Sequence, residues 1–338
     1  MKNIAILGAS GFVGNELISM CINHPEINIA GLSANRSAGE QINLEDIKKK
    51  NKSELYYKKI DEIDFSNIDF VFNCLPNKQL CKIIKDLPSE ISVIDLSIDF
   101  RLNNKQDYLD WYKFKHDNPD LIEDFKYGLT ELNRSQIKTA KYIANPGCYA
   151  TSVLIPLTIL VQEKAIRTDN IIIDAKSGYS GAGKTKDKHQ LLKDVSENIK
   201  TYGVGDHKHI AEINQELTIH NNDKNIEVFF SANLIPVERG ILSNIYISPV
   251  ELSAEEIQKI LYDKFKDEAF IKTLPLNEIP TTREVVGTNN LIIGVKKGYK
   301  NDTICIVSAL DNLVKGAAGQ AMQNFNLMNQ MDEGTALI

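Results

Sequence analysis

One cysteine stands in a context that favours nucleophilic chemistry. Cys148 follows Asn145-Pro146-Gly147, where the short apolar run 142–144 gives way to a longer apolar stretch, 151–161. We expect the stretch 151–161 to form a helix, with Cys148 at or near its N-terminus. There the helix dipole and free N–H groups favour the reactive thiolate. A lone cysteine is otherwise more often a small buried hydrophobe. The other cysteines, at positions 21, 74, 81 and 305, lie in apolar runs that fit this second interpretation.

Thiol chemistry needs a proton carrier, and the densest histidine cluster is HKHIAE, from His207 to Glu212. Apolar residues at 210, 213 and 217 predict a helix that starts within this cluster. Side chains at i and i+2 point apart on a helix, so we expect one histidine to be catalytic and the other structural or substrate-binding. Zinc binding is the alternative, but no third ligand has suitable spacing, and no metal is expected. The remaining histidines, at 24, 116, 189 and 220, are expected to be exposed.

An arginine follows another predicted strand end. The block DLSIDFRL begins at Asp95 and brings Arg101 to a position where a bidentate grip on carboxylate or phosphate could form. Arg239 and Arg283 could do the same. For each arginine, a surface ion pair is the alternative.

A glycine-rich turn opens the chain. The segment from Gly8 to Gly14, GASGFVG, fits G-x-x-G-x-x-G directly after the apolar run 3–7 and before a helical pattern, as a dinucleotide site requires. Such glycines let the backbone approach a pyrophosphate, whose charge the helix N-terminus favours. The candidate cofactor-binding residues here are Gly8, Ser10, Gly11, Phe12, Val13 and Gly14. A tight turn without a ligand is the alternative.

The second strand predicts which dinucleotide binds. NAD sites usually carry an Asp or Glu at its end, whereas residues 27–39 contain no acid and offer Ser33, Asn35 and Arg36. These side chains suit a 2′-phosphate, so we expect NADP(H). A solvated loop cation is the alternative for Arg36.

A second glycine-rich segment, from Gly178 to Thr185, satisfies the P-loop pattern G-x-x-x-x-G-K-[ST] and follows the strand-like run 171–175. No apolar helical stripe follows it, and the surrounding chain does not read as repeated βαβ units. We therefore interpret it as a flexible loop at the rim of the substrate site, with Lys184 available for an anionic group. Hydrolysis of a nucleoside triphosphate is the alternative.

Two domains must position these residues, because 338 residues exceed one ordinary core. Nearly continuous apolar strands at 3–7, 27–33, 69–74 and 92–96 alternate with helical stretches, which indicates a buried parallel sheet. After residue 147, strands at 227–232, 241–250, 291–295 and 304–310 predict an antiparallel or mixed sheet. Ser253 and Glu256 form a capping box before a surface helix. A last helix is expected from Leu313 to about Met331.

Composition limits the partners. With 39 basic and 45 acidic residues the net charge is −6, which offers no footprint for nucleic acid or an anionic membrane. No stretch approaches ~18 uninterrupted apolar residues, so no membrane span is expected. Five cysteines form an odd set without metal spacing, which indicates reduced thiols and a cytoplasmic protein. We expect small-molecule partners.

Over nearly its whole length the chain resembles the N-acetyl-gamma-glutamyl-phosphate reductases. The blocks occur in order and together are specific: GASGFVG at Gly8, DLSIDFRL at Asp95, YGLTELNR at Tyr127, NPGCYAT at Asn145, SGYSGAGK at Ser177, HKHIAEI at His207, NLIPVERGI at Asn233, GTNNLIIGV at Gly287 and DNLVKGAAGQAMQN at Asp311. The departures, none at a reacting group, are Thr130, Ala150 and Ala211 where Pro is usual, Lys208 and Lys184 where Arg is usual, and Asn77 where His is common.

The resemblance implies roles for the candidate residues. Cys148 would be the nucleophile, and a histidine of the H-x-H segment the acid/base, with His207 favoured over His209. Arg101, Ser177, Gly178 and Glu212 would surround the substrate, and Asn312 would approach the nicotinamide. The last helix would return to the first domain. The expected architecture is α/β, with a Rossmann-type NADP-binding domain of residues 1–147 plus 312–338 and an α+β catalytic and oligomerisation domain of residues 148–311.

The implied activity is the NADPH-dependent reduction of N-acetyl-L-glutamyl 5-phosphate to the 5-semialdehyde in arginine biosynthesis, through a Cys148 thioester and with release of phosphate. A homodimer or homotetramer built through the second domain's sheet is expected. Two rivals keep the chemistry and change the acid: aspartate-semialdehyde dehydrogenase and the reductase of a carrier-linked aminoadipyl phosphate. A rival of another class is a non-catalytic NADP sensor.

Overall fold

The computed structural model describes residues 1–42, 55–182, 196–222, 224–298 and 303–337. The chain divides into two compact units, one formed by Met1–Pro146 with Ala317–Ile338 and the other by Gly147–Gly316. The expected division lay after residue 147 and before residue 312. The C-terminal segment from Ala317 belongs to the first unit.

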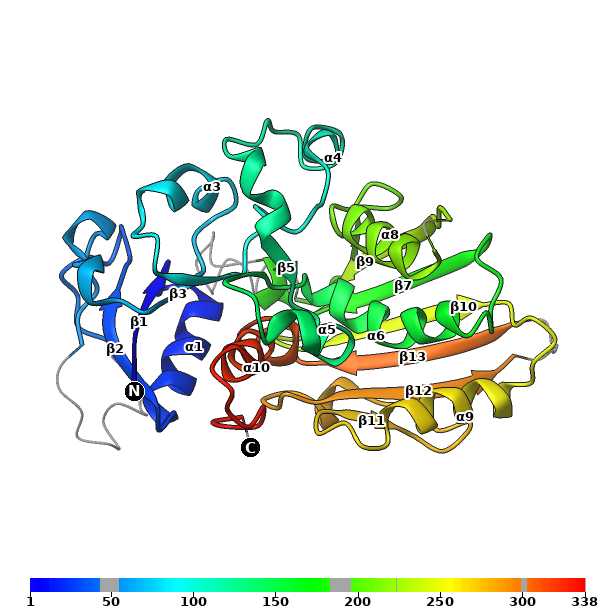
Figure 1. Ribbon diagram of the computed structural model, residues 1–338. Helices are drawn as coiled ribbons and strands as arrows, with labels where there is room; N and C mark the ends of the chain where they lie inside the picture. The colour runs from blue at the N-terminus through cyan, green and yellow to red at the C-terminus, as the bar shows by residue number, and fades with distance from the viewer. Residues whose placement is uncertain (43–54, 183–195, 223, 299–302, 338) are drawn as a thin grey trace. The chain divides into compact units, whose positions relative to one another are not determined.

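The first unit contains a six-stranded parallel sheet in the order β2-β1-β3-β4-β6-β5. Figure 1 labels β1, β2, β3 and β5 of this sheet. Its strands are β1 (Lys2–Leu7), β2 (Ile27–Leu32), β3 (Phe70–Asn73), β4 (Ser92–Asp95), β5 (Phe125–Tyr127) and β6 (Tyr142–Ala144). The strand order reverses beside β1, and ligands of such sheets bind at the carboxyl ends of the strands at this point. The glycine turn from Gly8 lies at that end.

Helices pack on this sheet through apolar side chains. Phe325 of α10 (Gly319–Met328) lies against Phe70 and Phe72 of β3, with ring centroids 4.9 and 5.6 Å apart. The other helices of this unit are α1 (Phe12–Asn23), α3 (Leu80–Ile83), α4 (Lys105–Asp110) and α5 (Thr130–Ile137). The expected single C-terminal helix is instead a short π-helical turn, Val314–Ala318, followed by α10.

The second unit contains a seven-stranded sheet in the order β11-β12-β13-β10-β7-β9-β8. Its strands are β7 (Ile171–Ser177), β8 (Lys200–Tyr202), β9 (Val228–Leu234), β10 (Ile241–Ile247), β11 (Ile271–Thr273), β12 (Leu291–Lys297) and β13 (Ile304–Leu310). The β7/β9 and β11/β12 pairs are parallel and the others antiparallel, so the sheet is mixed.

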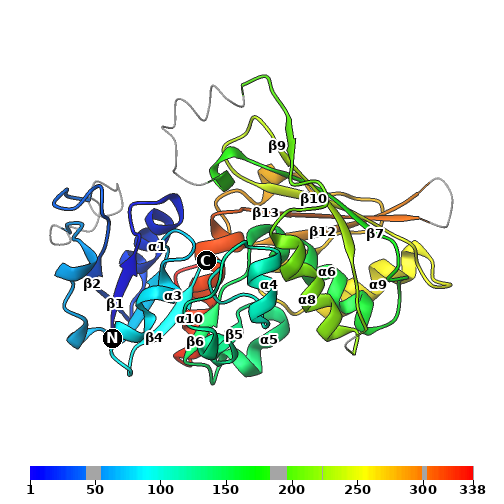
Figure 2. The ribbon, with the colours of Figure 1, turned by 90° about the horizontal axis from the view of Figure 1, so that it is seen from above.

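Three helices of this unit, α6 (Cys148–Gln162), α8 (His209–His220) and α9 (Ala254–Phe265), lie on one side of the sheet (Figure 2). Helix α6 is apolar on all sides and almost wholly buried, which makes it the central helix of this core. The Ser253–Glu256 capping box that starts α9 is confirmed. Short 3-10 turns occupy Ile60–Glu62, Phe65–Asn67, Ile84–Asp86, Pro119–Asp124, Tyr179–Ala182 and Thr282–Glu284.

Within the described ranges, no helix is both long enough and apolar enough to cross a membrane.

Candidate active site

Cys148 is the first residue of α6, and Gly147 is its N-cap. The expected helix began slightly later, at residue 151. The first turn of α6 has no acidic residue of its own. The backbone N–H of Gly147 donates to Oε1 of Glu212 at 2.7 Å, and Glu212 is fully buried on α8. A carboxylate from a second helix therefore fixes the residue before the thiol.

Gly316 lies against the nucleophile. A Cβ at this position would be 2.7 Å from the Cβ of Cys148, closer than real Cβ contacts allow. Gly316 belongs to the π-helical turn, whose start is capped by Asp311: Oδ1 accepts from the N–H groups of Leu313 at 2.8 Å and Val314 at 3.3 Å. Such turns are frequent at functional sites. Gly316 lies within the helix predicted from Leu313 to about Met331, and nothing in the sequence identified it as a site residue.

Aromatic rings gather around the residue after the nucleophile. The ring of Tyr149 lies 5.5 Å from that of His207, 5.8 Å from that of His209 and 5.3 Å from that of Phe230. Its hydroxyl is 3.2 Å from the Tyr202 hydroxyl. Burial raises the pKa of Tyr202, the hydrogen bond with Tyr149 lowers it, and the electrostatic influence of Cys148 raises it. Sequence reasoning missed both tyrosines as site residues.

The two histidines of the H-x-H segment lie together. Their ring centroids are 4.8 Å apart, so the expectation that they point apart is wrong. The reason is that α8 begins at His209, which leaves His207 in the preceding turn. Nδ1 of His207 accepts from the backbone N–H of His209 at 3.2 Å. Burial and, secondarily, Lys208 lower the pKa of His207 to about 4. The neutral ring therefore carries its proton on Nε2.

Other histidines differ from the expectation of exposure. His24 and His116 are buried, because each finds a polar partner inside the first unit: Nε2 of His24 bonds Oδ1 of Asn326 at 2.9 Å, and Nε2 of His116 bonds the Asp99 carbonyl at 2.7 Å. His220 is half-buried, and His189 lies outside the described residues. In the described part of the chain, no three side chains of metal-ligand type come together.

The four cysteines away from the site were expected to be small buried hydrophobes, and this holds for two of them. Cys21 and Cys81 are buried, whereas Cys74 and Cys305 are partly exposed. All five cysteines are free thiols.

The loop after β7 is held against the loop before β10. Gly178 N–H donates to the Gly240 carbonyl at 2.9 Å, and the Ser180 hydroxyl donates to the Glu238 carbonyl at 2.6 Å. A Cβ on Gly178 would lie 2.6 Å from that carbonyl oxygen, so only glycine fits. Ser177, the last residue of β7, is buried. Lys184 lies outside the described residues.

Asn312 links the same two loops. Its Oδ1 accepts from the Gly240 N–H at 2.8 Å, and its Nδ2 donates to the Ser180 hydroxyl at 3.0 Å. It belongs to the second unit, although the expected boundary put it in the first. Asn312 therefore holds the two loops together. Sequence reasoning expected this residue at the nicotinamide and did not anticipate its contacts with the loops.

Arg101 is buried in the first unit, where it contacts backbone. Its Nε donates to the carbonyl of Asn145 at 2.8 Å, and an Nη donates to the carbonyl of Leu96 at 2.9 Å. Arg101 therefore holds Asn145, the first residue of the NPGC segment, directly after β6. Arg239 instead lies 3.7 Å from the buried carboxylate of Asp311.

The glycine turn has the geometry that a dinucleotide needs. Gly8 has φ +75°, and a Cβ there would lie 2.4 Å from the carbonyl oxygen of Cys74. Both the backbone conformation and the lack of space therefore exclude a side chain. A Cβ on Gly14 would lie 2.4 Å from the carbonyl oxygen of Ala9, so this glycine permits the close packing of α1. At Gly11, the N-cap of α1, space remains, and no side chain caps the helix. The bare helix start suits an anionic group.

The other candidate residues around this turn differ in position and in contacts. Ser10 lies in the turn itself, and Phe12 and Val13 are the first two residues of α1. Ser33, expected at a 2′-phosphate, is buried, and its hydroxyl accepts from the Gly8 N–H at 3.1 Å. Its hydroxyl therefore shapes the turn.

Two cations lie on the exposed loops nearby. Arg36 is exposed. Lys58 is also exposed and forms an isolated parallel bridge with Ser33, which sequence reasoning missed because the two residues are distant in sequence. The bridge between Ser33 and Lys58 thus brings a second cation, Lys58, to the loop after β2.

Two family models match most of the chain. Residues 3–140 match the model of the semialdehyde dehydrogenase NAD binding domain, and residues 148–312 match that of the semialdehyde dehydrogenase dimerisation domain. An N-acetyl-gamma-glutamyl-phosphate reductase of Ehrlichia ruminantium (strain Gardel) is 43% identical over 99% of this chain and 97% of its own length.

The chain belongs to the N-acetyl-gamma-glutamyl-phosphate reductase family. Its members include a reductase of Campylobacter jejuni subsp. jejuni, 39% identical over 99% of this chain and 97% of its own length. A probable chloroplastic member from Oryza sativa subsp. japonica is 40% identical over 99% of this chain and 80% of its own length. The family resemblance inferred from the ordered sequence blocks is confirmed.

Solved structures agree on the fold. Aspartate semialdehyde dehydrogenase II from Vibrio cholerae, complexed with ASA, has a TM-score of 0.74 at 20% identity and covers 98% of both chains. The aspartate semialdehyde dehydrogenase from Candida albicans, solved with NADP, has a TM-score of 0.69 at 18% identity, covering 97% of this chain and 98% of its own. The α/β architecture with a Rossmann-type first unit and a mixed sheet in the second is confirmed.

Proposed function

We propose that the protein reduces N-acetyl-L-glutamyl 5-phosphate to N-acetyl-L-glutamate 5-semialdehyde with NADPH and releases phosphate, as a step of arginine biosynthesis. The observation that carries the proposal is Cys148 at the start of α6, with its N-cap fixed by Glu212 and with His207 held neutral in the adjoining cluster. Membership of the family supports the choice of substrate.

Cys148 is the proposed nucleophile. The start of α6 stabilises its thiolate, which attacks the acyl carbon, forms a thioester and expels phosphate. The N–H groups of the first turn of α6 can donate to the oxygen that becomes negative during this attack. Glu212 acts here as a positioning residue, because its carboxylate holds the Gly147 N–H and so fixes the start of the helix.

When bound, NADPH supplies the hydride that reduces the thioester. His207 is the proposed proton-holding residue at this stage. Its proton lies on Nε2, because Nδ1 is engaged by the His209 N–H, so Nε2–H can donate to the oxyanion of the thiohemiacetal. His209, buried beside it, would orient this ring. Collapse of the thiohemiacetal returns Cys148 to the thiolate and releases the aldehyde.

The glycine turn is the proposed pyrophosphate site. Gly8, Ser10, Gly11, Phe12, Val13 and Gly14 would surround the pyrophosphate, with the bare start of α1 facing its charge. Arg36 and Lys58 are proposed to hold the 2′-phosphate of NADP(H), since both are exposed cations at the loop after β2 and residues 27–39 contain no acid to receive a ribose hydroxyl. Ser33 would support the turn rather than the phosphate.

The remaining candidates divide into two groups. Arg101, Ser177, Gly178 and Lys184 are proposed to surround the substrate, with Arg101 also holding the Asn145 carbonyl. Asn312 is proposed to keep the loops of Gly178 and Gly240 together beside the nicotinamide.

A homo-oligomer, either a homodimer or a homotetramer, is proposed to form through the second unit's sheet. Ile172 of β7 and Phe229 of β9 are direct partners in the sheet, yet they remain 38% and 53% exposed. An apolar pair on an open sheet face is typical of an interface. Phe229→Glu should lower the molar mass measured by light scattering, whereas an unchanged mass would exclude this face. Free thiols and NADP(H) use are consistent with a cytoplasmic protein.

The deciding experiment runs the reaction backwards. Protein, NADP, inorganic phosphate and N-acetyl-glutamate semialdehyde are mixed, and NADPH absorbance is followed. We expect phosphate-dependent turnover that Cys148→Ala abolishes, while the control Cys305→Ala, a partly exposed cysteine on β13, retains it. Turnover with aspartate semialdehyde alone, or with a carrier-linked aminoadipate semialdehyde alone, would instead assign the rival substrate. A protein that binds NADP but turns over none of them would be a sensor.

A further inference from the structure

A short turn between β8 and α8 closes on the ring of His207. Gly203, the first residue after β8, has φ +57°. A Cβ at Gly203 would lie 2.8 Å from Cδ2 and 2.9 Å from Cβ of His207, closer than real Cβ contacts allow. The side chain of His207 therefore occupies the space that a side chain at position 203 would need.

The turn is attached to β9 on both sides of this contact. Tyr202, the last residue of β8, pairs with Ala232 in the antiparallel β8/β9 ladder. Two residues after Gly203, the N–H of Gly205 donates to the carbonyl of Phe230 at 2.9 Å. A turn that withdrew to make room for a side chain at position 203 would strain one of these attachments. The histidine ring would therefore have to move instead.

Three aromatic side chains pack against the His207 ring. The ring centroids of Tyr149, Tyr202 and Phe230 lie 5.5, 5.6 and 5.3 Å from that of His207. They come from α6, β8 and β9, so three elements of the second unit define where the ring lies. Gly203 adds a backbone contact at Cδ2, which is the ring atom bonded to Nε2. Nε2 carries the proton in the proposed reaction.

Charged residues flank His207 within the turn. Burial and, secondarily, the charge of Lys208 lower the pKa of His207 to about 4, whereas the charge of Asp206 raises it. The titratable side chains that face the ring from the packed elements are those of Tyr149, Tyr202 and His209. Because burial is the largest influence, a ring displaced toward solvent should have a pKa nearer the ordinary value of 6.5.

We propose that Gly203 is a positioning residue for His207: because position 203 has no side chain, the attached turn can close on the ring and hold it beside Tyr149. The catalytic consequence rests on the proposed function, in which His207 holds a proton, whereas the effect on the ring does not. Gly203 has no group that could transfer a proton, so it acts on the reaction through His207.

The same turn supplies a matched control. Gly205 also has a positive φ, +73°, and in the described part of the chain the nearest atom to a Cβ there is Cε2 of Phe229 at 4.0 Å. Alanine at either position would be strained by the positive φ. Only alanine at position 203 would also meet His207, so the difference between the two variants isolates this contact.

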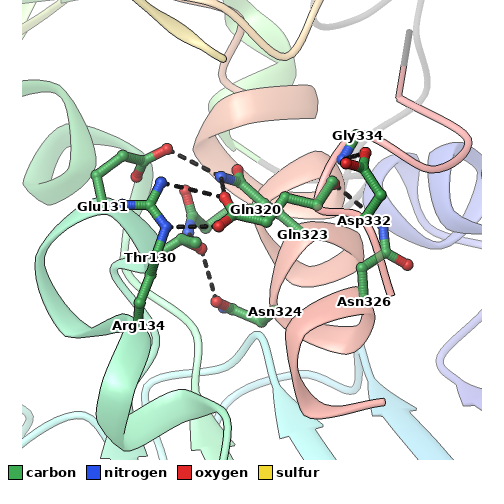
Figure 3. Close-up of polar contacts among 10 residues, drawn as sticks. Thr130, Glu131, Arg134, Gln320, Gln323, Asn324, Asn326, Asp332 and Gly334 are labelled. Atoms are coloured by element: carbon green, nitrogen blue, oxygen red, sulfur yellow. Dashed lines mark hydrogen bonds and ion pairs between the residues drawn. The ribbon is translucent and has the colours of Figure 1, made fainter. Parts of the chain in front are cut away.

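A second control lowers stability in the other unit. Thr130 of α5 is fully buried, and its hydroxyl donates to Oδ1 of Asn324 on α10 at 2.7 Å (Figure 3). Thr130→Val keeps the branched shape and removes this bond, so it should lower the thermal midpoint. Because the lost bond lies within the first unit, the variant shows whether reduced stability alone affects His207.

The experiment follows the His207 ring by NMR in protein labelled with carbon-13 at histidine Cε1, and His207→Gln identifies its signal. In wild type, Gly205→Ala and Thr130→Val, this signal should not titrate between about pH 8 and pH 5.5. In Gly203→Ala it should titrate in this range, because the displaced ring is less buried. In the phosphate-dependent assay, kcat of Gly203→Ala should be about ten- to a hundredfold below that of Gly205→Ala, as for a small misplacement of a reacting group.

A His207 signal that responds equally in Gly203→Ala and Gly205→Ala would overturn the proposal, whatever the kcat values. If wild type turns over no semialdehyde, the proposed function fails, and the NMR signal alone then decides whether Gly203 positions the ring. A signal that changes only in Gly203→Ala, with equal kcat values, would support the positioning and exclude His207 as the proton-holding residue. If an alanine variant does not fold, Gly203→Asn and Gly205→Asn replace the pair, because asparagine tolerates a positive φ better.

Discussion

Gly316 and Cys148 lie so close that a methyl group on the glycine would meet the Cβ of the cysteine at 2.7 Å. The π-helical turn that contains Gly316 thus forms one wall around the nucleophile. The backbone of α6 fixes the Cβ of Cys148, and the backbone of a second segment lies directly against it.

Gly316→Ala should lower kcat by about ten- to a hundredfold, because the added methyl group must push Cys148 away from its position. Steady-state kinetics with saturating semialdehyde, phosphate and NADP measures the effect. The control is Gly39→Ala, where the new Cβ has open space but φ +87° strains the backbone, so stability falls without an equal loss of kcat. Equal kcat losses in the two variants would refute this explanation.

The low pKa of His207 predicts acid sensitivity of the fold. Its pKa is about 4 in the folded protein and near 6.5 in the unfolded chain, so the unfolded state binds the extra proton between these values. The stability that His207 contributes is present above about pH 6.5 and is lost as pH falls toward 4. His207→Gln should remove about 1–3 kcal/mol of this pH dependence. Urea unfolding at pH 4.5 and pH 7.5 tests it, and an unchanged difference between the two pH values would contradict the assignment.

Glu216 predicts the opposite trend. Burial, with the nearby charge of Glu212, raises its pKa to about 7, so the folded state holds its proton more tightly than the unfolded chain does. The stability from this group is present below the unfolded pKa near 4.5 and is lost as pH rises through about 7. Glu216→Gln should therefore raise the thermal midpoint at pH 8 and change it little at pH 5. A midpoint that rises equally at both pH values would show that ionisation is not the cause.

Arg36 and Lys58 should discriminate between the two dinucleotides. Arg36→Ala and Lys58→Ala should each raise KM for NADP by about tenfold, the equivalent of ~1.4 kcal/mol, because each removes a charge from the 2′-phosphate. KM for NAD should not change. Lys59→Ala, at the adjacent exposed lysine, is the control and should leave both values alone. If KM for NADP and NAD rise together, the cations do not read the 2′-phosphate.

Local patterns predicted the parts of the site that depend on neighbours in sequence. Gly8 was predicted as a turn residue, and the structure gives the reason, since its φ is +75° and the carbonyl of Cys74 lies against it. The start of α6 was expected a few residues late, because Tyr149 and Ala150 carry no helix-start signal of their own. Gly147 as N-cap, one residue before the thiol, accounts for the difference.

The rest depended on contacts between distant segments. Nothing near Lys58 or Gly316 in the sequence indicates that they lie beside Ser33 or Cys148. His24 was expected to be exposed, and it is buried because Asn326, far along the chain, supplies its hydrogen-bond partner. Periodicity reports which face of an element is apolar, but it does not report which remote polar group will make burial tolerable.

The position of α10 has a consequence for how the protein is made. Phe325 completes the core around Phe70 and Phe72, yet it is translated only after the whole of Gly147–Gly316. At ~5–20 residues per second, the N-terminal part must wait on the order of ten seconds or longer on the ribosome for its missing helix. We expect the nascent first unit to expose that apolar surface throughout this interval, while the second unit can fold before it.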